Sequence, residues 1–159
     1  MELSMGVVFA IIGAAISMGL AAIASGIGVG LAGVAGAGVI SEDPKKFGPV
    51  LVLQALPQTQ GIYGFLSAFL VILKLGLTTG NVVSPAVDKG WQILIACLPV
   101  ALAGLVSGIH QGKVCASGVY MVAKQPKDLM KPVIMAALVE TYAVLGLLIT
   151  ILLLNGIKL

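Results

Sequence analysis

Long apolar stretches separated by short polar loops dominate this chain. Four stretches, near residues 5–40, 48–77, 90–123 and 131–155, are each longer than the roughly 20 residues that a helix needs to cross about 30 Å of hydrocarbon. The pattern predicts an all-α membrane protein with four transmembrane helices. Stretches of more than about 30 residues must tilt or protrude, so we expect tall helices with cytoplasmic extensions.

Composition supports a membrane protein. The 159 residues are 59% hydrophobic and 9% charged, with a mean hydropathy of +1.14. A soluble domain needs far more charge on its surface, so that class is excluded. The chain has no arginine cluster and no basic patch with aromatic residues, which excludes nucleic acid as a partner.

The lysines predict the orientation in the membrane. Six of the nine lie in or near two short loops, 41–47 and 124–131. Because short cytoplasmic loops carry an excess of positive charge, we predict that both loops face the cytoplasm. The connection 78–89 and both termini then lie on the opposite side.

The chain carries an internal duplication. Shifting the sequence by 82 residues aligns the first two stretches with the last two without a gap. The matched residues include Leu20, Ser25, Gly26, Gly30, Pro44, Leu56, Thr59 and Gly64 against Leu102, Ser107, Gly108, Gly112, Pro126, Leu138, Thr141 and Gly146. We predict two tandem helical hairpins of the same sense, residues 1–77 and 90–159, joined by the non-cytoplasmic connection 78–89. Repeats of the same sense argue against an inverted-repeat transporter.

Glu140 is the only acidic residue within the apolar stretches, and its counterpart in the first repeat is Gln58. A carboxylate within hydrocarbon costs at least a few kcal/mol, so an acid at this depth indicates a functional site. The duplication is therefore asymmetric in charge.

Polar partners for Glu140 are found in the second and third stretches. Leu56, Thr59, Gln60 and Tyr63 share one helix face at spacings of three and four residues. Counted from the cytoplasmic loops at about 1.5 Å per residue, Gln60 and Gln111 lie at a depth similar to that of Glu140. Tyr63 is placed to donate a hydrogen bond to the carboxylate.

The chemistry of these groups points to a monovalent cation. Pro57 distorts its helix, so nearby backbone carbonyl oxygens can face inward. Carboxylate, carboxamide, hydroxyl and carbonyl oxygens are hard ligands that suit a dehydrated alkali cation better than a transition metal. One negative charge is neutralised by a monovalent ion. Taken singly, Gln and Thr in membrane helices often serve only as hydrogen-bonded contacts between helices.

Glycine-rich runs occupy the first and third stretches. Small residues at helical spacing allow backbones to approach closely, so we predict an inner layer of these two helices with the other two outside. The residues assigned to this packing are Gly26, Gly30, Gly33, Gly104, Gly108 and Gly112. A GxGxxG string within the first run lacks the strand and βαβ context of a dinucleotide site, so it is spurious. We assign His110, next to Gln111, to packing or to a pore.

The segments LPQTQGIYGF, SGIHQGK and VETYAVLG on a duplicated four-helix frame resemble the rotor-ring proteolipid (subunit K or c) of V-type ATPases. The resemblance covers essentially the whole chain and is greatest to the bacterial sodium-translocating type. It implies a homo-oligomeric ring with one ion-binding carboxylate, Glu140, per four helices. It also implies partner subunits that hydrolyse ATP, a central stalk at the cytoplasmic loops, lipid around the ring, and a stator subunit that supplies an arginine. The host membrane is then expected to be a bacterial cell membrane.

The sodium-translocating members of that family bind Na⁺ through a leucine carbonyl, a threonine, two glutamines and the glutamate. The resemblance therefore implies a Na⁺ site at Glu140, Gln111, Gln60, Thr59 and the backbone carbonyl of Leu56, with Tyr63 as hydrogen-bond partner of the carboxylate. Gln58 and His110 depart from some relatives, which have a glycine and a small residue there, but neither departure removes a ligand.

Two other functions stay open. The same rotor carrying H⁺ requires Glu140 alone, and a passive oligomeric channel or structural membrane protein requires only the glycine stripes. An enzyme in its own right is not expected, since the chain has no nucleophile and base pair and no phosphate-binding loop. We therefore expect it to bind no nucleotide.

Overall fold

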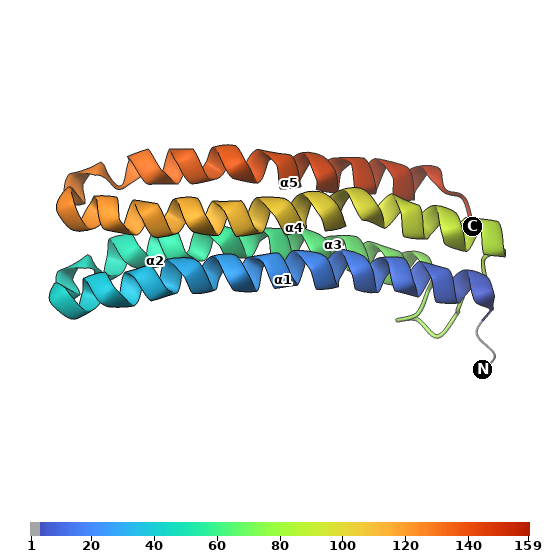
Figure 1. Cartoon of the computed structure of the whole chain (residues 1–159). Coiled ribbons are helices and arrows are strands. Elements are labelled where there is room, and N and C mark those ends of the chain that lie inside the picture. Colours follow the sequence, from blue (N-terminus) through green and yellow to red (C-terminus); the bar gives the residue numbers. More distant parts are fainter. Residues whose placement is uncertain (1–3) are drawn as a thin grey trace.

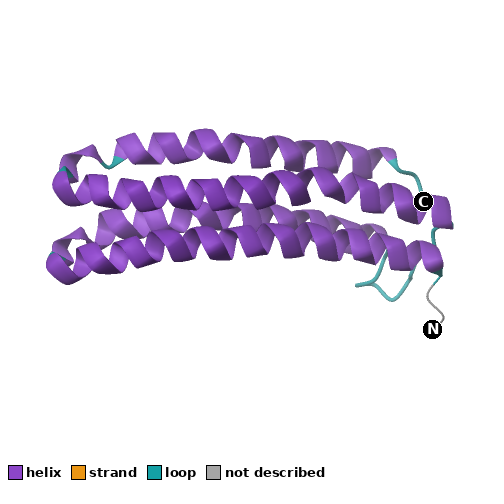
Figure 2. Cartoon of the chain, in the orientation of Figure 1, coloured by secondary structure: helices purple, strands orange, loops and turns teal. Residues whose placement is uncertain are grey.

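The computed structural model describes residues 4–159, and the regular elements in that range are all helical (Figure 2). The first hairpin comprises α1 (Met5–Glu42), the 3₁₀ turn η1 (Pro44–Lys46), α2 (Phe47–Ala55), the 3₁₀ turn η2 (Leu56–Gln58) and α3 (Thr59–Lys74). The second comprises α4 (Val87–Lys124), the 3₁₀ turn η3 (Pro126–Asp128) and α5 (Met130–Gly156). Within residues 4–159, four helical stretches are long and apolar enough to cross a membrane, which confirms the prediction of four transmembrane helices.

The two hairpins lie side by side and point the same way. In Figure 1, α1 and α4 run in the same direction next to each other, with α2 and α3 beside α1 and with α5 beside α4. The helix–helix contact between α1 and α4 is the most extensive one in the described chain. The start of α1 and the end of α5 lie at one end, and η1 and η3 lie at the other. The prediction of tandem hairpins is thus confirmed.

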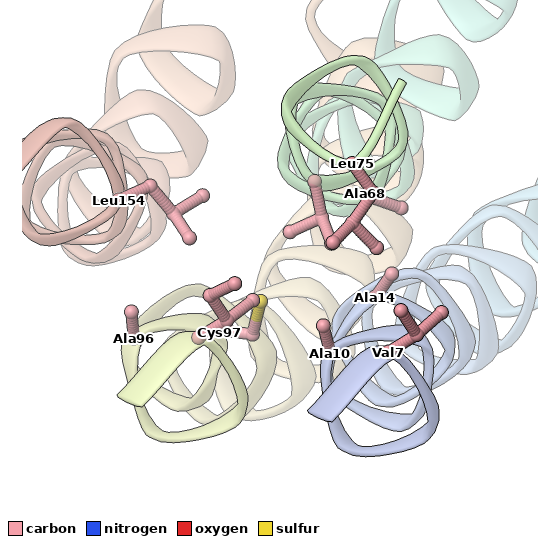
Figure 3. Packing of buried hydrophobic residues seen from close by; sticks show 10 residues of the cluster. Val7, Ala10, Ala14, Ala68, Leu75, Ala96, Cys97 and Leu154 are labelled. Atoms are coloured by element: carbon pink, nitrogen blue, oxygen red, sulfur yellow. The ribbon is translucent and has the colours of Figure 1, made fainter. Parts of the chain in front are cut away.

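Buried residues of α1, α3, α4 and α5 form the core at the end of the bundle near the start of α1. Figure 3 shows Leu154 of α5 and Ala68 of α3 pointing toward Ala10 of α1 and Cys97 of α4. The small side chains on α1 and α4 let those two helices pack closely, while larger residues come from the turn after α3 (Leu75) and from α5 (Leu154).

The inner helices are longer than a bilayer is thick. Each of α1 and α4 has 38 residues, which at 1.5 Å per residue gives about 57 Å against about 30 Å of hydrocarbon. Ser4 caps the start of α1 by accepting a hydrogen bond from the Val7 backbone. The helix is followed by Asp43, whose carboxylate accepts from the Lys45 amide and so caps η1.

The second stretch ends earlier than the sequence pattern predicted. It was expected to reach residue 77, but α3 ends at Lys74. Gly76 has φ +67°, in the left-handed region that glycine adopts without steric cost and that commonly ends helices. The apolar residues Leu75 and Leu77 therefore belong to the turn after α3, and Leu75 packs into the core.

Glycine pairs set the close approach of α1 to α4. A Cβ atom on Gly112 would overlap the backbone of Gly28, and one on Gly90 would overlap the backbone of Gly6. On α1 the contact at this level is thus made by Gly28, whereas Gly26 and Gly30 have open space beside them within this chain. Their packing against another copy stays a prediction.

The other glycines assigned to packing lie at several contacts. Gly108 faces Ala24 and Gly104 faces Ala21, so both lie against α1. Gly33 instead lies against the Gln54 side chain of α2. The predicted inner layer therefore exists within one chain, and its small residues come from a face of α1 adjacent to the predicted one.

Candidate ion-binding site

Glu140 lies half-buried on α5, where two side chains donate hydrogen bonds to its carboxylate. The Tyr63 hydroxyl on α3 donates to Oε1 at 2.6 Å, and Gln111 Nε2 on α4 donates to Oε2 at 3.2 Å. No lysine or arginine among the described residues forms a salt bridge with it. The carboxylate is therefore held by neutral donors from two neighbouring helices, and no cationic side chain of the described residues pairs with it.

The two glutamines form the buried part of the site, and both are 0% exposed. Gln60 Nε2 donates to Gln111 Oε1 at 2.6 Å, and Gln111 Nε2 also donates to the Ala136 carbonyl at 3.2 Å. Every buried side-chain nitrogen and oxygen in the described chain has a hydrogen-bond partner. Since an unsatisfied buried polar group costs about 1–3 kcal/mol, this network also fixes the side-chain positions.

A break in the second stretch brings a backbone carbonyl to the site. Proline has no backbone N–H, and the helix changes to the 3₁₀ turn η2 at Pro57. The Leu56 carbonyl then accepts from the Thr59 backbone N–H and from the Thr59 hydroxyl at 3.1 Å. Thr59 Oγ1 also lies 3.4 Å from Gln60 Oε1. The Leu56 carbonyl oxygen, Thr59 Oγ1 and Gln60 Oε1 therefore lie close together.

All six residues predicted for the site are brought together by these bonds. Hydrogen bonds join Gln60, Gln111, Glu140 and Tyr63, and Thr59 Oγ1, which donates to the Leu56 carbonyl, lies 3.4 Å from Gln60 Oε1. That they bind an ion stays a prediction. The described residues contain no group of three or more His, Cys, Asp or Glu side chains that could hold a metal ion.

Sequence reasoning missed Ser107. Its hydroxyl donates to the Val139 carbonyl at 2.9 Å and accepts from Gln60 Nε2 at 3.2 Å, so it links α3, α4 and α5 at the site. The sequence holds a signal for it, because Ser107 lies one helical turn before Gln111 on the same face. The sequence pattern singled it out only as the repeat partner of Ser25.

Two residues near the site lie outside its network. Gln58, at the repeat position of Glu140, is exposed and makes none of the hydrogen bonds that join the site. His110 is also exposed, on the face of α4 that it shares with Val106, next to Tyr142 of α5. His110 is therefore no part of the Glu140 network.

A duplicated transmembrane hairpin with one carboxylate held by neutral donors at mid-helix defines a membrane proteolipid of the ion-carrying class. The chain matches the family model for the C subunit of ATP synthase twice, over residues 12–71 and 94–153. The two matches are offset by the same 82 residues as the internal repeat. The chain belongs to this family of ATP synthase C subunits.

Two curated relatives match nearly the whole chain. V-type sodium ATPase subunit K of Enterococcus hirae is 46% identical over 148 residues, which cover 93% of this chain and 91% of that protein. A-type ATP synthase subunit K of Methanocaldococcus jannaschii is 45% identical over 146 residues, which cover 92% of this chain but 61% of that protein.

These comparisons confirm the resemblance found in the three motifs. The chain is an integral membrane protein and a non-catalytic, ion-translocating subunit of a rotary ATPase.

Proposed function

We propose that this chain is a rotor subunit that carries Na⁺ across the membrane on Glu140 as a ring of identical subunits turns, driven by ATP hydrolysis in partner subunits. The main support is the group of hydrogen-bonded side chains that lies between the Leu56 carbonyl and the Glu140 carboxylate. It gathers hard oxygen donors around a single negative charge. One of the curated relatives is named as a sodium ATPase subunit, in agreement with this ion.

The proposed ligands are oxygens of Glu140, Gln111, Gln60 and Thr59, with the Leu56 carbonyl. Tyr63 is not a ligand in this scheme, since its hydroxyl donates to Glu140 Oε1 and holds the carboxylate in place. Na⁺ leaves the site neutral, whereas a divalent ion leaves it with one positive charge. Neutrality favours Na⁺ because the site lies within the apolar part of the bundle, where a net charge is expensive.

Rotation of the ring explains why the negative charge of Glu140 must be neutralised. A glutamate that faces lipid has to be neutral, either protonated or paired with Na⁺, because desolvation disfavours the bare anion. A stator subunit with an intramembrane arginine makes the anion tolerable, so the ion leaves there. An aqueous half-channel then reloads the site from the other side of the membrane.

The lysine-rich loops 41–47 and 124–131 are proposed to face the cytoplasm and to contact the central stalk. In this orientation both termini lie on the non-cytoplasmic side of a bacterial cell membrane. Each charge moved costs about 2.3 kcal/mol per 100 mV, so one carboxylate per four helices lowers the number of ions per turn and favours pumping against steep gradients. A measured ion-to-ATP ratio tests this gearing.

H⁺ is the second candidate ion. Glu140 alone suffices to carry a proton, and nothing in the glutamine network prevents protonation at low sodium. A passive channel or structural role accounts for the glycine contacts. It does not account for the hydrogen bonds that Tyr63 and Gln111 donate to Glu140.

The deciding experiment is carbodiimide labelling of Glu140 in the assembled ring, at fixed pH, with NaCl or with choline chloride at equal ionic strength. Carbodiimides react with the protonated carboxyl group, so bound Na⁺ protects it. We expect millimolar Na⁺ to slow labelling strongly. Labelling that is indifferent to Na⁺ supports H⁺ as the carried ion. A ring with Glu140→Gln is the control, since any label it retains arises elsewhere.

A further inference from the structure

Ser107 is a buried hydroxyl beside the candidate site that the proposed ligand set does not use. It lies on α4 and is 4% exposed. Its side-chain hydrogen bonds go to Gln60 on α3 and to the backbone of α5 at Val139. Ser107 therefore reaches the site without a bond to the Glu140 carboxylate.

The single hydrogen of the Ser107 hydroxyl is used by α5. A backbone carbonyl can only accept a hydrogen bond, so Ser107 is the donor in its 2.9 Å bond to the Val139 carbonyl. The Ser107 oxygen can then only accept from the Gln60 side chain, at 3.2 Å. Of the two polar atoms at the end of Gln60, only the nitrogen donates, so Ser107 selects the nitrogen.

Gln111 selects the same orientation of the Gln60 carboxamide. Gln111 Nε2 donates to two acceptors, the Ala136 carbonyl and Glu140 Oε2, each at 3.2 Å. Gln111 Oε1 therefore faces Gln60 and accepts from Gln60 Nε2 at 2.6 Å. Both hydrogens of Gln60 Nε2 are thus used by acceptors on α4.

This orientation leaves Gln60 Oε1 on the side of the 3₁₀ turn η2. It lies 3.4 Å from Thr59 Oγ1, whose single hydrogen also serves the Leu56 carbonyl at 3.1 Å. Three oxygens therefore lie together with one hydrogen between them, an arrangement that a cation complements. If the carboxamide were turned over, its NH₂ group would lie there and repel Na⁺. Its oxygen would meet the oxygens of Ser107 and Gln111 with no hydrogen between them.

We propose that Ser107 is a positioning residue for Na⁺ binding, which holds the Gln60 carboxamide with its oxygen toward the ion. This inference rests on the proposed function and adds to it a residue that is not itself a ligand. The ion is bound through Gln60 Oε1, and Ser107 acts only through the nitrogen of the same side chain.

The support that Ser107 gives does not depend on the charge of Glu140. The other donors at the site bond to the carboxylate itself, so their bonds change when that group is protonated. Ser107 bonds instead to the backbone carbonyl of Val139, one residue before Glu140, which does not titrate. The carboxamide is therefore oriented before the ion arrives, and the cost of ordering it is not subtracted from the affinity for the ion.

Three substitutions of Ser107 in the assembled ring test this role. Ser107→Ala removes the hydroxyl, Ser107→Thr keeps it, and Ser107→Val has the shape of threonine without the hydroxyl. Ser107 borders a hollow of about 460 Å³ between α4 and α5, so the chain has room for the added methyl groups. We expect the Na⁺ concentration that half-protects Glu140 from carbodiimide to rise about fivefold in the alanine and valine variants and to stay unchanged in the threonine variant.

A pH series of carbodiimide labelling without Na⁺ separates positioning from an effect on the carboxylate. The pH at which labelling of Glu140 falls by half should be unchanged in Ser107→Ala. It should change in Tyr63→Phe, which removes a donor to the carboxylate. The matched control is Ser67→Ala, which removes a fully buried serine of α3 that bonds to Cys97 Sγ at 3.9 Å. This control should alter neither measurement.

The outcomes distinguish this inference from the proposed function. Equal half-protecting Na⁺ concentrations in Ser107→Thr and Ser107→Val overturn the role of the hydroxyl, and an altered pH dependence in Ser107→Ala overturns its action through Gln60. In both cases Na⁺ protection of the unsubstituted ring leaves the proposed function standing. Labelling of the unsubstituted ring that is indifferent to Na⁺ overturns both. Should the larger variants form no ring on a native gel, an unchanged half-protecting concentration in Ser107→Ala alone contradicts the inference.

Discussion

The two hairpins share a sequence pattern and a backbone course, yet only the second carries a carboxylate within its apolar stretches. Glu140 receives hydrogen bonds from Tyr63 and Gln111, whereas Gln58, its repeat partner, is exposed and outside the network. The supporting groups differ as well, since the counterparts of Gln111 and Tyr63 are Val29 and Leu145. The repeat position of the acid thus holds no carboxylate, and the repeat positions of its two hydrogen-bond donors hold no polar side chain.

Each hairpin has a proline in one helix, and a hydroxyl on the neighbouring helix accepts a backbone amide near it. In the first, the outer helix changes to a 3₁₀ turn at Pro57, and Ser25 of α1 accepts the Gly61 amide at 2.8 Å. In the second, the inner helix contains Pro99, and Thr150 of α5 accepts the Val100 amide at 3.2 Å. The inner helix α4 continues through Pro99, so only Pro57 lies at a change of helix type, and that change is at the site.

The positions of the threonines show what that break achieves. Thr59 Oγ1 bonds to the carbonyl three residues earlier, that of Leu56, whereas its repeat partner Thr141 bonds four residues back, to Ala137. In the first case the hydroxyl and carbonyl lie beside the buried glutamines, and in the second they lie on an exposed helix surface. The first hairpin thus supplies oxygen atoms held in fixed positions, and the second supplies the carboxylate.

The largest effect is expected from Glu140→Gln, which gives the second hairpin the residue type of the first. Coupled ion transport in the reconstituted ATPase should fall to background, since no charge remains to pair with the ion. The carboxamide keeps the shape of the side chain, so the ring should assemble as before on a native gel. Normal transport by this variant would contradict the ion-carrying role and favour a passive structural protein.

Gln111→Val introduces the residue found at the matching position of the first hairpin. It removes a donor to the Glu140 carboxylate, and hydrogen bonds to charged groups are worth about 1.5–3 kcal/mol. It also removes the partner of Gln60 Nε2 and one proposed Na⁺ ligand. We expect the Na⁺ concentration that half-protects Glu140 from carbodiimide to rise about 100-fold. Gln58→Leu, outside the network, is the matched control and should leave that concentration unchanged.

Tyr63→Phe removes only the hydroxyl that donates to Glu140 Oε1 at 2.6 Å. Every proposed ligand stays in place, so the loss is smaller, about tenfold in the half-protecting Na⁺ concentration. Tyr142→Phe tests the exposed tyrosine two residues after Glu140 and should have no effect on Na⁺ protection. Equal effects of the two variants would show that Tyr63 does not position the carboxylate.

The sequence predicted much of this arrangement because the lysine-rich loops provide a measure of depth. Counting from them placed Gln60, Gln111 and Glu140 at one level, and helical spacing put Thr59 and Tyr63 on the face of Gln60. The rotation of α1 could not be predicted in this way. Its glycines recur at every second position from Gly26 to Gly30, so their spacing does not decide which one faces α4. Packing selects Gly28, where no Cβ fits.

Ser107 was missed for a related reason. A serine in a glycine-rich helix is typical of small packing residues, and its repeat partner Ser25 suggested the same use for both. In the structure the two hydroxyls have different partners, Ser25 at the Pro57 break and Ser107 between Gln60 and the Val139 carbonyl. The difference arises because α4 lies between two outer helices within one chain, whereas α1 has a second such neighbour only in the proposed ring.

The smallest expected effect provides the sharpest test of that asymmetry. Gln58→Glu in the Glu140→Gln background moves the carboxylate to the first hairpin without its partners. Val29 and Leu145 stand where Gln111 and Tyr63 are needed, so we expect neither Na⁺-protected labelling of residue 58 nor recovery of transport. Na⁺ protection in this variant would mean that a carboxylate alone makes the site. In the proposed ring, where the first hairpin of one copy lies beside the second hairpin of the next, adding Val29→Gln and Leu145→Tyr places donors around residue 58 across the boundary between copies. Partial recovery of Na⁺ protection there, and only there, would show that the site depends on a set of partners that one hairpin has and the other lacks.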